Sequence, residues 1–376
     1  MKKVLALLLA LAMIFTFAAC GNKTEEAATE ETTEVTFAVA MITDYGDITD
    51  ESFNQATYEG CKEFCAENGI KFNYYKPAGD SDAERVAMID AAIADGYNVI
   101  VTPGYAFAGA LNETMETYPD VYFIALDVSS GDFGTETLPS NAFSAVYQEE
   151  LCGYMAGYAA VKLGYTHLGF LGGMAVPAVV RYGFGFVQGA DAAAAELGVD
   201  VTVEYAYGNQ FYGDADITAA MDTWYQSKGV EVVFACGGGI YTSAAEAAAK
   251  VDGKVIGVDV DQAPTIDKYG EGMTVTSAMK GLAATVKSML GELILNGNWD
   301  VYGGNIESLG LVSGTDVESN YVQIPYESTQ WADGFTQDDY KALVADMFSG
   351  KITVSNDTSA MPAVTAITVN DLGNIK

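Results

Sequence analysis

Acidic side chains gather directly ahead of an aromatic residue near the start of the chain. The stretch ITDYGDITDESFNQATYEG, residues 42–60, holds four acidic residues before Phe53 and then continues as a helix-like sequence. Carboxylates accept hydrogen bonds from donor groups, and an exposed ring can stack on a flat surface. Whether these groups can reach a ligand depends on where the fold places them.

Apolar, β-rich runs alternate with helical segments along most of the chain. We predict strands at 36–42, 71–75, 98–102, 121–127, 167–171, 199–205, 230–235 and 254–258. The first four have the pattern of strands buried on both faces. We predict helices near 148–163, 180–197, 214–228 and 240–251. The strand–helix succession occurs twice and predicts two parallel sheets, each covered by helices on both faces.

Helix boundaries carry their own sequence signals. Ser52-x-x-Gln55 and Ser81-x-x-Glu84 are predicted to be capping boxes, and Gly69 and Gly96 stand where left-handed C-caps are expected.

Ligands of such sheets sit beyond the carboxyl ends of the strands. Residues 44–50 follow the first strand at that end, and Phe53 falls in the first turn of the next helix. Asp50 also suits the positive end of the helix dipole. A capping and solubilising role explains Asp50 and Ser52 but explains Asp44 and Phe53 poorly. We therefore predict that Asp44 and Phe53 project into a ligand crevice.

The N-terminus resembles a secretory signal. Two lysines precede an apolar run at 4–19, which is shorter than the roughly 20 residues needed to cross a membrane. Ala18-Ala19-Cys20-Gly21 resembles a bacterial lipobox, so we expect a signal peptide at 1–20 and lipidation of Cys20. The composition of the polar segment 21–35 predicts a flexible acidic tether. These features predict an extracytoplasmic protein, lipid-anchored to the cell membrane.

The chain is strongly acidic. Without Lys2 and Lys3, 16 Lys and Arg stand against 51 Asp and Glu, a formal charge of −35. This excludes nucleic acid as a partner, since binding it requires lysines and arginines that neutralise phosphates. The roughly 340 residues after the tether are enough for two ordinary domains.

The positions of cysteine and histidine in the sequence give little support for a metal site or a disulfide. We interpret Cys61, Cys65, Cys152 and Cys236 as small core residues, since a spacing of four along one helix gives poor disulfide geometry. The single histidine, His167, starts an apolar strand and is interpreted as structural. No metal and no cofactor are expected.

Motifs spread over residues 36–354 together resemble one family. They are Thr43-Asp44-x-Gly46-x-Ile48-x-Asp50-x-Ser52-Phe53-Asn54-Gln55, Phe123-Ile124-Ala125-x-Asp127, Gly172-Gly173-Met174-x-x-Pro177, Ile256-Gly257-Val258-Asp259-x-Asp261-Gln262, Thr276-Ser277-x-x-Lys280 and Gly350-Lys351-Ile352-x-Val354. The chain resembles the basic membrane lipoprotein (BMP, PnrA-like) family, substrate-binding lipoproteins of ABC importers that take up purine nucleosides.

The resemblance implies an α/β type I periplasmic-binding-protein fold, in which three hinge crossings join two Rossmann-like lobes. We place the crossings near Ala145, near Asp261 and after Trp299. Lobe 1 is then 36–145 plus 262–302, and lobe 2 is 146–261 plus 303–376.

The resemblance also implies residue roles. Asp44 and Asn54 hydrogen-bond the base, Phe53 stacks on one of its faces, Asp127 reaches the ligand from lobe 1, Phe211 closes on the other face, Gly238 lines the floor, and Asp259 with Lys280 grips the ribose hydroxyls. Tyr212 is an alternative to Phe211 for the stacking role. The partners implied are a purine nucleoside, an ABC permease and the membrane, and the protein is expected to be monomeric.

A sugar-binding protein and a nucleoside-processing enzyme are the alternatives to this function. A sugar-binding protein with the same fold also suits Asp259 and Lys280. A nucleoside-processing enzyme is disfavoured, because Asp44, Asp50, Asp127 and Asp259 lie on separate strands rather than around one calcium ion, and no GxSxG elbow occurs.

The run Gly237–Gly239 lacks the spacing of a phosphate loop and is interpreted as a tight turn or a close approach of the backbone to a ligand. Tyr45 and Tyr105 follow strand ends and could line the crevice, and Arg181 is expected to pair with an acid.

Overall fold

The computed structural model describes residues 36–44 and 46–376. Within it, Phe37–Lys376 form one compact unit. The predicted signal peptide, Cys20, the tether and Tyr45 lie outside the described residues. Among the described helices, none is long and apolar enough to cross a membrane.

The first sheet is built mainly from strands of the N-terminal half of the chain. Its strand order is β11-β5-β4-β3-β1-β2, and every neighbouring pair is parallel. The strands are β1 (Ala38–Ile42), β2 (Lys71–Tyr75), β3 (Val99–Pro103), β4 (Tyr122–Leu126), β5 (Ala142–Tyr147) and β11 (Ile306–Leu309). The helices with it are α1 (Phe53–Asn68), α2 (Asp82–Ala94), α3 (Ala108–Thr117), α4 (Ser130–Phe133), α10 (Leu282–Leu290) and α11 (Trp299–Tyr302).

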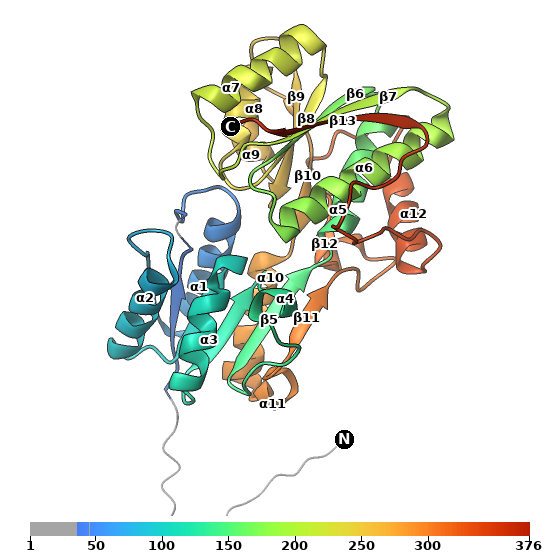
Figure 1. Ribbon diagram of the computed structural model, residues 1–376. Helices are drawn as coiled ribbons and strands as arrows, with labels where there is room; N and C mark the ends of the chain where they lie inside the picture. Colours follow the sequence, from blue (N-terminus) through green and yellow to red (C-terminus); the bar gives the residue numbers. More distant parts are fainter. Residues whose placement is uncertain (1–35, 45) are drawn as a thin grey trace, which may run out of the picture. The chain divides into compact units, whose positions relative to one another are not determined.

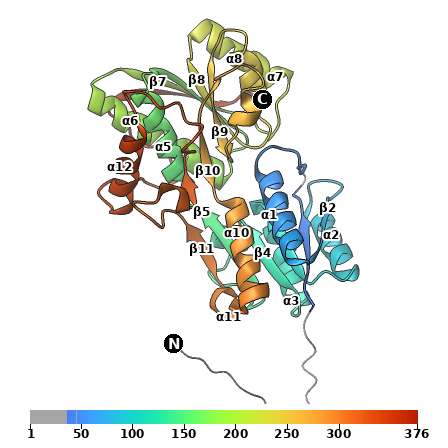
Figure 2. The same cartoon turned by 180° about the vertical axis from the view of Figure 1, so that it is seen from behind.

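A second sheet has the order β12-β10-β9-β8-β6-β7-β13, in which only the β10–β12 pair is antiparallel among the described strands. Its strands are β6 (His167–Gly172), β7 (Val201–Tyr207), β8 (Val232–Cys236), β9 (Lys254–Asp259), β10 (Thr274–Lys280), β12 (Val322–Gln323) and β13 (Ile367–Asn374). Its helices are α5 (Glu149–Lys162), α6 (Pro177–Leu197), α7 (Ala215–Asp222), α8 (Tyr241–Ala248), α9 (Ala263–Ile266) and α12 (Gln337–Phe348) (Figures 1 and 2).

Side-chain alternation along the strands builds a core on each face of each sheet. In β1, Val39 and Met41 join the core with α1 and α10, while Ala40 and Ile42 join the core with α2 and α3. Strand β8 divides in the same way between α5–α6 and α7–α8. The predicted α/β fold with two helix-covered parallel sheets is therefore confirmed.

Strand β2 differs from its prediction as a strand buried on both faces. Its five residues are all exposed or half-buried. The reason is its position at the edge of the first sheet, where it pairs only with β1.

The predicted lobe boundaries need correction at two crossings. Strand β10 continues the parallel ladder beside β9, so residues 262–280 belong with the second sheet and not with lobe 1. Strand β11 pairs with β5, which places 306–309 with the first sheet and not with lobe 2. The chain thus crosses between the sheets after Tyr147, after Lys280 and after Leu309. The predicted crossings near Asp261 and after Trp299 were too early, because strand pairing decides membership.

Helices α5 and α6 lie side by side (Figures 1 and 2), and their backbones approach closely at four glycines. Gly153 and Gly157 of α5 face carbonyl groups of α6, and Gly185 and Gly189 of α6 face carbonyl groups of α5. A Cβ at any of the four would overlap a backbone oxygen of the facing helix. The missing side chains therefore set the distance between these two helices.

We predict that Gly157→Ala destabilises the protein by roughly 1–3 kcal/mol, because the added methyl group forces the helices apart. Gly291→Ala is the matched control: Gly291 has helical dihedral angles, and its added Cβ would meet only the Phe64 ring at 3.8 Å. The control should be neutral or more stable by up to about 1 kcal/mol. Chemical denaturation measures both, and a Gly157→Ala protein as stable as wild type would contradict the close packing.

Candidate functional site

The start of α1 is held by Asp50 rather than by the predicted capping box. The Asp50 carboxylate accepts backbone N–H bonds from Ser52, Asn54 and Gln55 at 2.9, 2.9 and 3.1 Å. The Ser52 hydroxyl makes no capping bond among the described residues and instead donates to Oδ2 of Asp259 at 2.5 Å. Ser52 therefore links the first helix to the end of β9 in the second sheet.

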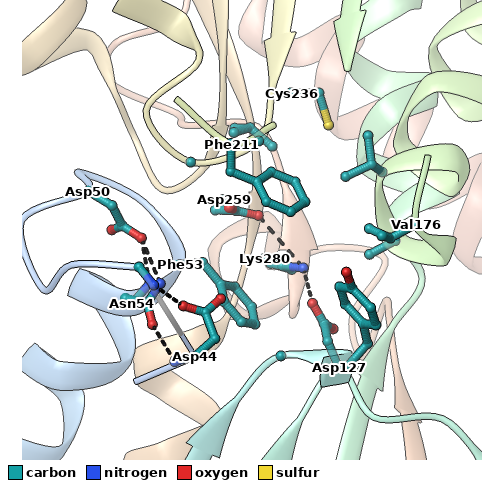
Figure 3. Close-up of a pocket in the computed structure, with 18 of the residues that line it drawn as sticks. Asp44, Asp50, Phe53, Asn54, Asp127, Val176, Phe211, Cys236, Asp259 and Lys280 are labelled. Atoms are coloured by element: carbon teal, nitrogen blue, oxygen red, sulfur yellow. Dashed lines mark hydrogen bonds and ion pairs between the residues drawn. The ribbon is translucent and has the colours of Figure 1, made fainter. Parts of the chain in front are cut away.

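The same Asp50 carboxylate fixes Asn54. The Asn54 amide nitrogen donates to Oδ2 of Asp50 at 3.1 Å, and its oxygen accepts the Asp44 N–H at 3.4 Å. Burial raises the pKa of Asp50 to about 6, although the hydrogen bonds that its carboxylate accepts lower the pKa in part. Asn54 thus presents a preset amide beside Asp44 (Figure 3).

All eight predicted ligand residues line one cavity of about 470 Å³, which lies in the usual range for small-molecule sites. They are Asp44, Phe53, Asn54, Asp127, Phe211, Gly238, Asp259 and Lys280. The cavity lies at the carboxyl ends of strands from both sheets, as the parallel topology predicts. Tyr105 and Tyr182 also line it, and sequence reasoning missed further lining residues, among them Gly104, Ser129, Asp132 and Val176.

Two phenylalanine rings enter the cavity from opposite sides. Phe53 comes from the first turn of α1, and Phe211 comes from the loop between β7 and α7 (Figure 3). Glycines make room for Phe211, since a Cβ at Gly173 or Gly237 would collide with its ring. The neighbouring Tyr212 also borders the cavity but is 59% exposed.

A buried ammonium lies between carboxylates at the polar end of the cavity. Lys280 contacts Asp127 directly, stands 3.2 Å from Glu149 and 3.7 Å from Asp259, and has a side chain only 3% exposed (Figure 3). Burial alone would lower the pKa of Lys280, but the three carboxylates raise it well above its ordinary value. Lys280 therefore stays charged.

Arg181 pairs with an acid, as predicted. Its Nε donates to Oε2 of Glu149 at 2.6 Å. Burial alone would raise the pKa of Glu149, but Lys280 and Arg181 lower it below its ordinary value. Sequence reasoning missed Glu149; its only signal is an acidic pair at the start of a helix that directly follows a buried strand.

Asp127 keeps one unsatisfied oxygen at the cavity. Burial raises its pKa to about 6 despite the opposing charge of Lys280. Its Oδ1 is buried and has no hydrogen-bond partner among the described residues. An unpaired buried oxygen costs free energy, so this atom is suited to accept a hydrogen bond from a ligand.

Asp127 and Asp259 hold equivalent positions in the two sheets. Asp127 directly follows β4 and Asp259 is the last residue of β9, and each of these strands lies two places from the first strand of its sheet, β1 or β6. Each has a left-handed backbone, with φ of 59° and 65°. Such conformations are strained in residues other than glycine and are concentrated at functional sites.

The described residues contain no cluster of three or more His, Cys, Asp and Glu side chains that could hold a metal ion. Cys61, Cys65, Cys152 and Cys236 are buried and unpaired, as predicted, and burial raises the pKa of each thiol. His167 lies 3.7 Å from Glu204 in the second sheet, away from the cavity lining.

The fold and the cavity define a solute-binding protein of the type I periplasmic-binding class. Among solved structures, the chain is similar to an ABC transporter system solute-binding protein from Conexibacter woesei, with a TM-score of 0.65, 22% identity, and coverage of 85% of this chain and 99% of that one. The profile of the Bmp family, described as "ABC transporter substrate-binding protein PnrA-like", matches residues 37–324. The chain belongs to this family, which confirms the predicted relationship.

Curated relatives agree with the family. The ABC transporter nucleoside-binding protein BmpA of Lactococcus lactis is 28% identical over 275 residues, covering 69% of this chain and 74% of the relative. An uncharacterized lipoprotein of Pyrococcus abyssi is 24% identical over 283 residues, covering 73% and 66%. The protein is thus similar to substrate-binding proteins of ABC transporters.

Glu150 predicts a pH dependence of stability. It is 5% exposed, its Oε2 has no partner among the described residues, and burial raises its pKa to about 7. A carboxyl whose pKa is raised by folding stabilises the protein below its unfolded-state pKa, and this stabilisation is lost as the pH rises to about 7.

We therefore predict that Glu150→Gln raises the free energy of unfolding at pH 8 by about 1–3 kcal/mol and changes it little at pH 5. Denaturant titrations at both pH values measure the effect. Glu113→Gln, an exchange at an exposed helical position, is the control and should show no such dependence. An equal effect of Glu150→Gln at both pH values would exclude titration of this group as the cause.

Proposed function

We propose that the protein is a lipid-anchored receptor that binds a purine nucleoside between its two sheets and delivers it to an ABC permease. The observation that carries this proposal is the pair of opposed rings, Phe53 and Phe211, in a cavity with hydrogen-bonding groups at both ends. The relative named as a nucleoside-binding protein supports the same ligand class.

The base is assigned to the space between the rings. A purine is a flat π-system, and each aromatic partner contributes on the order of 1–3 kcal/mol by stacking. Asp44 and the preset amide of Asn54 lie beside Phe53, where they can bond the edge of the base. Since the rings come from different sheets, only a closed arrangement makes both contacts, and ligand binding favours it.

The ribose is assigned to the Lys280 end. A vicinal diol offers two donors to carboxylates, and its oxygens accept from an ammonium. The unpaired oxygen of Asp127, together with Asp259 and Lys280, supplies both kinds of partner. Gly238, with φ of 51°, lines the cavity wall where a side chain would meet the Phe211 backbone.

The membrane link is assigned to Cys20. The lipobox-like Ala18-Ala19-Cys20-Gly21 and the relative named as a lipoprotein support a lipid anchor and an extracytoplasmic location. The acidic tether 21–35 would join the anchor to the folded unit. We propose that the receptor acts as a monomer with its permease.

A sugar or another small polyol is the second candidate ligand. The charged cluster around Lys280 favours it, because two carboxylates and an ammonium suit many hydroxyl patterns. Two opposed phenylalanines with an amide and an acid at their edge favour the heterocycle instead.

Titration calorimetry tests the ligand class. We expect heat of binding from inosine, guanosine or adenosine, and little from cytidine or ribose alone. Binding of ribose without binding of any purine nucleoside would reject the nucleoside proposal in favour of the sugar.

We predict that Phe211→Ala weakens purine nucleoside binding by about 1–3 kcal/mol, roughly 5- to 150-fold in Kd, through loss of one stacking face. Tyr212→Ala should change Kd by less than about threefold, since this side chain is mostly in solvent. Calorimetry on both variants decides which aromatic residue stacks. The reverse order of effects would assign the stacking role to Tyr212.

A further inference from the structure

Glu149 lies behind the cavity wall and contacts two of the three cationic side chains that line the cavity among the described residues. It is fully buried and is absent from the lining, while Lys280 and Arg181 both belong to the lining. Oε1 accepts from Lys280 at 3.2 Å and Oε2 accepts from Arg181 at 2.6 Å. Each carboxylate oxygen therefore holds one cation.

The position of Glu149 in the chain connects three elements of the fold. It is the first residue of α5 and directly follows the crossing from β5. Lys280 ends β10 at the second crossing, and Arg181 lies on α6. Helices α5 and α6 are held together by the glycine contacts described above. The Glu149 carboxylate, at the first crossing, thus binds one residue at the second crossing and one residue on α6.

The consequence for Lys280 follows from counting its donors. An ammonium has three N–H groups. Asp127 and Glu149 each take one, and Asp259, at 3.7 Å, is beyond hydrogen-bonding distance. The third N–H is left for a ligand oxygen beside Asp259, and the nitrogen also lies 4.8 Å from the centre of the Phe53 ring.

We propose that Glu149 is a positioning residue: from outside the cavity it orients the Lys280 ammonium toward the ligand hydroxyls and so sets the affinity for the polar part of the ligand. Where that part is taken to be ribose, the inference rests on the proposed function. Without the Glu149 charge, Lys280 moves toward Asp127 and Asp259 and competes with the ligand for the same oxygens.

The adjacent residue provides a matched control. Glu150 is the second residue of the same helix, is also buried, and carries the same side chain, but no hydrogen bond to a cation is found for it among the described residues. Glu149→Gln removes a charge that holds two cations, whereas Glu150→Gln removes a carboxyl without such a task.

The experiment measures guanosine and 2′,3′-dideoxyguanosine binding to the whole folded chain. For Glu149→Gln we expect the Kd for guanosine to rise by about 10-fold or more and the Kd for the dideoxy compound by less than about threefold, since only guanosine has the ribose hydroxyls that a charge-assisted hydrogen bond from Lys280 would hold. Glu150→Gln should change both by less than about threefold. Equal losses of both ligands in Glu149→Gln, or no loss, would overturn the inference.

Two further measurements keep the test decisive. If Glu149→Gln does not fold, Glu149→Asp keeps the charge, withdraws it by one methylene, and should again weaken guanosine more than the dideoxy compound. Without any ligand, carbon-13 NMR of the Lys280 ε-methylene should show a shift in Glu149→Gln and none in Glu150→Gln. If wild type binds no nucleoside, the proposed function fails, and the NMR comparison alone then supports or refutes the positioning role.

Discussion

The arrangement of the site depends on one buried ammonium. Lys280 is almost inaccessible to solvent, and an isolated charge in that position would be very costly. Three carboxylates offset the cost, and they come from the end of β4, the start of α5 and the end of β9. Both sheets and two of the crossings must therefore be in place before the charge is balanced. This requirement links the architecture to the cavity, because Lys280, Asp127 and Asp259 also form its polar wall.

The two sheets contribute to the cavity in a repeated way. Asp127 and Asp259 lie at the carboxyl ends of corresponding strands and share the left-handed backbone. The aromatic residues break the repetition, because Phe53 begins a helix whereas Phe211 lies in a loop between glycine-lined turns. The polar end of the cavity is therefore built from matching positions, and the flat space between the rings is built from unlike elements.

The sequence was sufficient to predict eight of the described strands, β1–β4 and β6–β9, and to place the eight predicted ligand residues at one cavity, because parallel strands bring their carboxyl ends to one edge. It was not sufficient for contacts between distant segments. Ser52 has the sequence context of a helix cap, yet its hydroxyl donates a hydrogen bond to the carboxylate of Asp259, 207 residues later. Asp50 caps the helix instead. Glu149 appears as an ordinary acidic helix start until Lys280 and Arg181 close around it. The predicted lobe boundaries were wrong for the same reason, since the local sequence patterns of β10 and β11 do not show with which strands they pair.

The four buried cysteines make the folded unit unreactive toward thiol reagents in the part that the structure describes. Their sulfur atoms are enclosed, and burial raises the pKa of each, so little thiolate forms near neutral pH. A cysteine introduced on an exposed surface beside each sheet would thus be labelled in preference to the native ones. Fluorescence energy transfer between two such dyes would report any change in the distance between the two sheets with the native core unchanged.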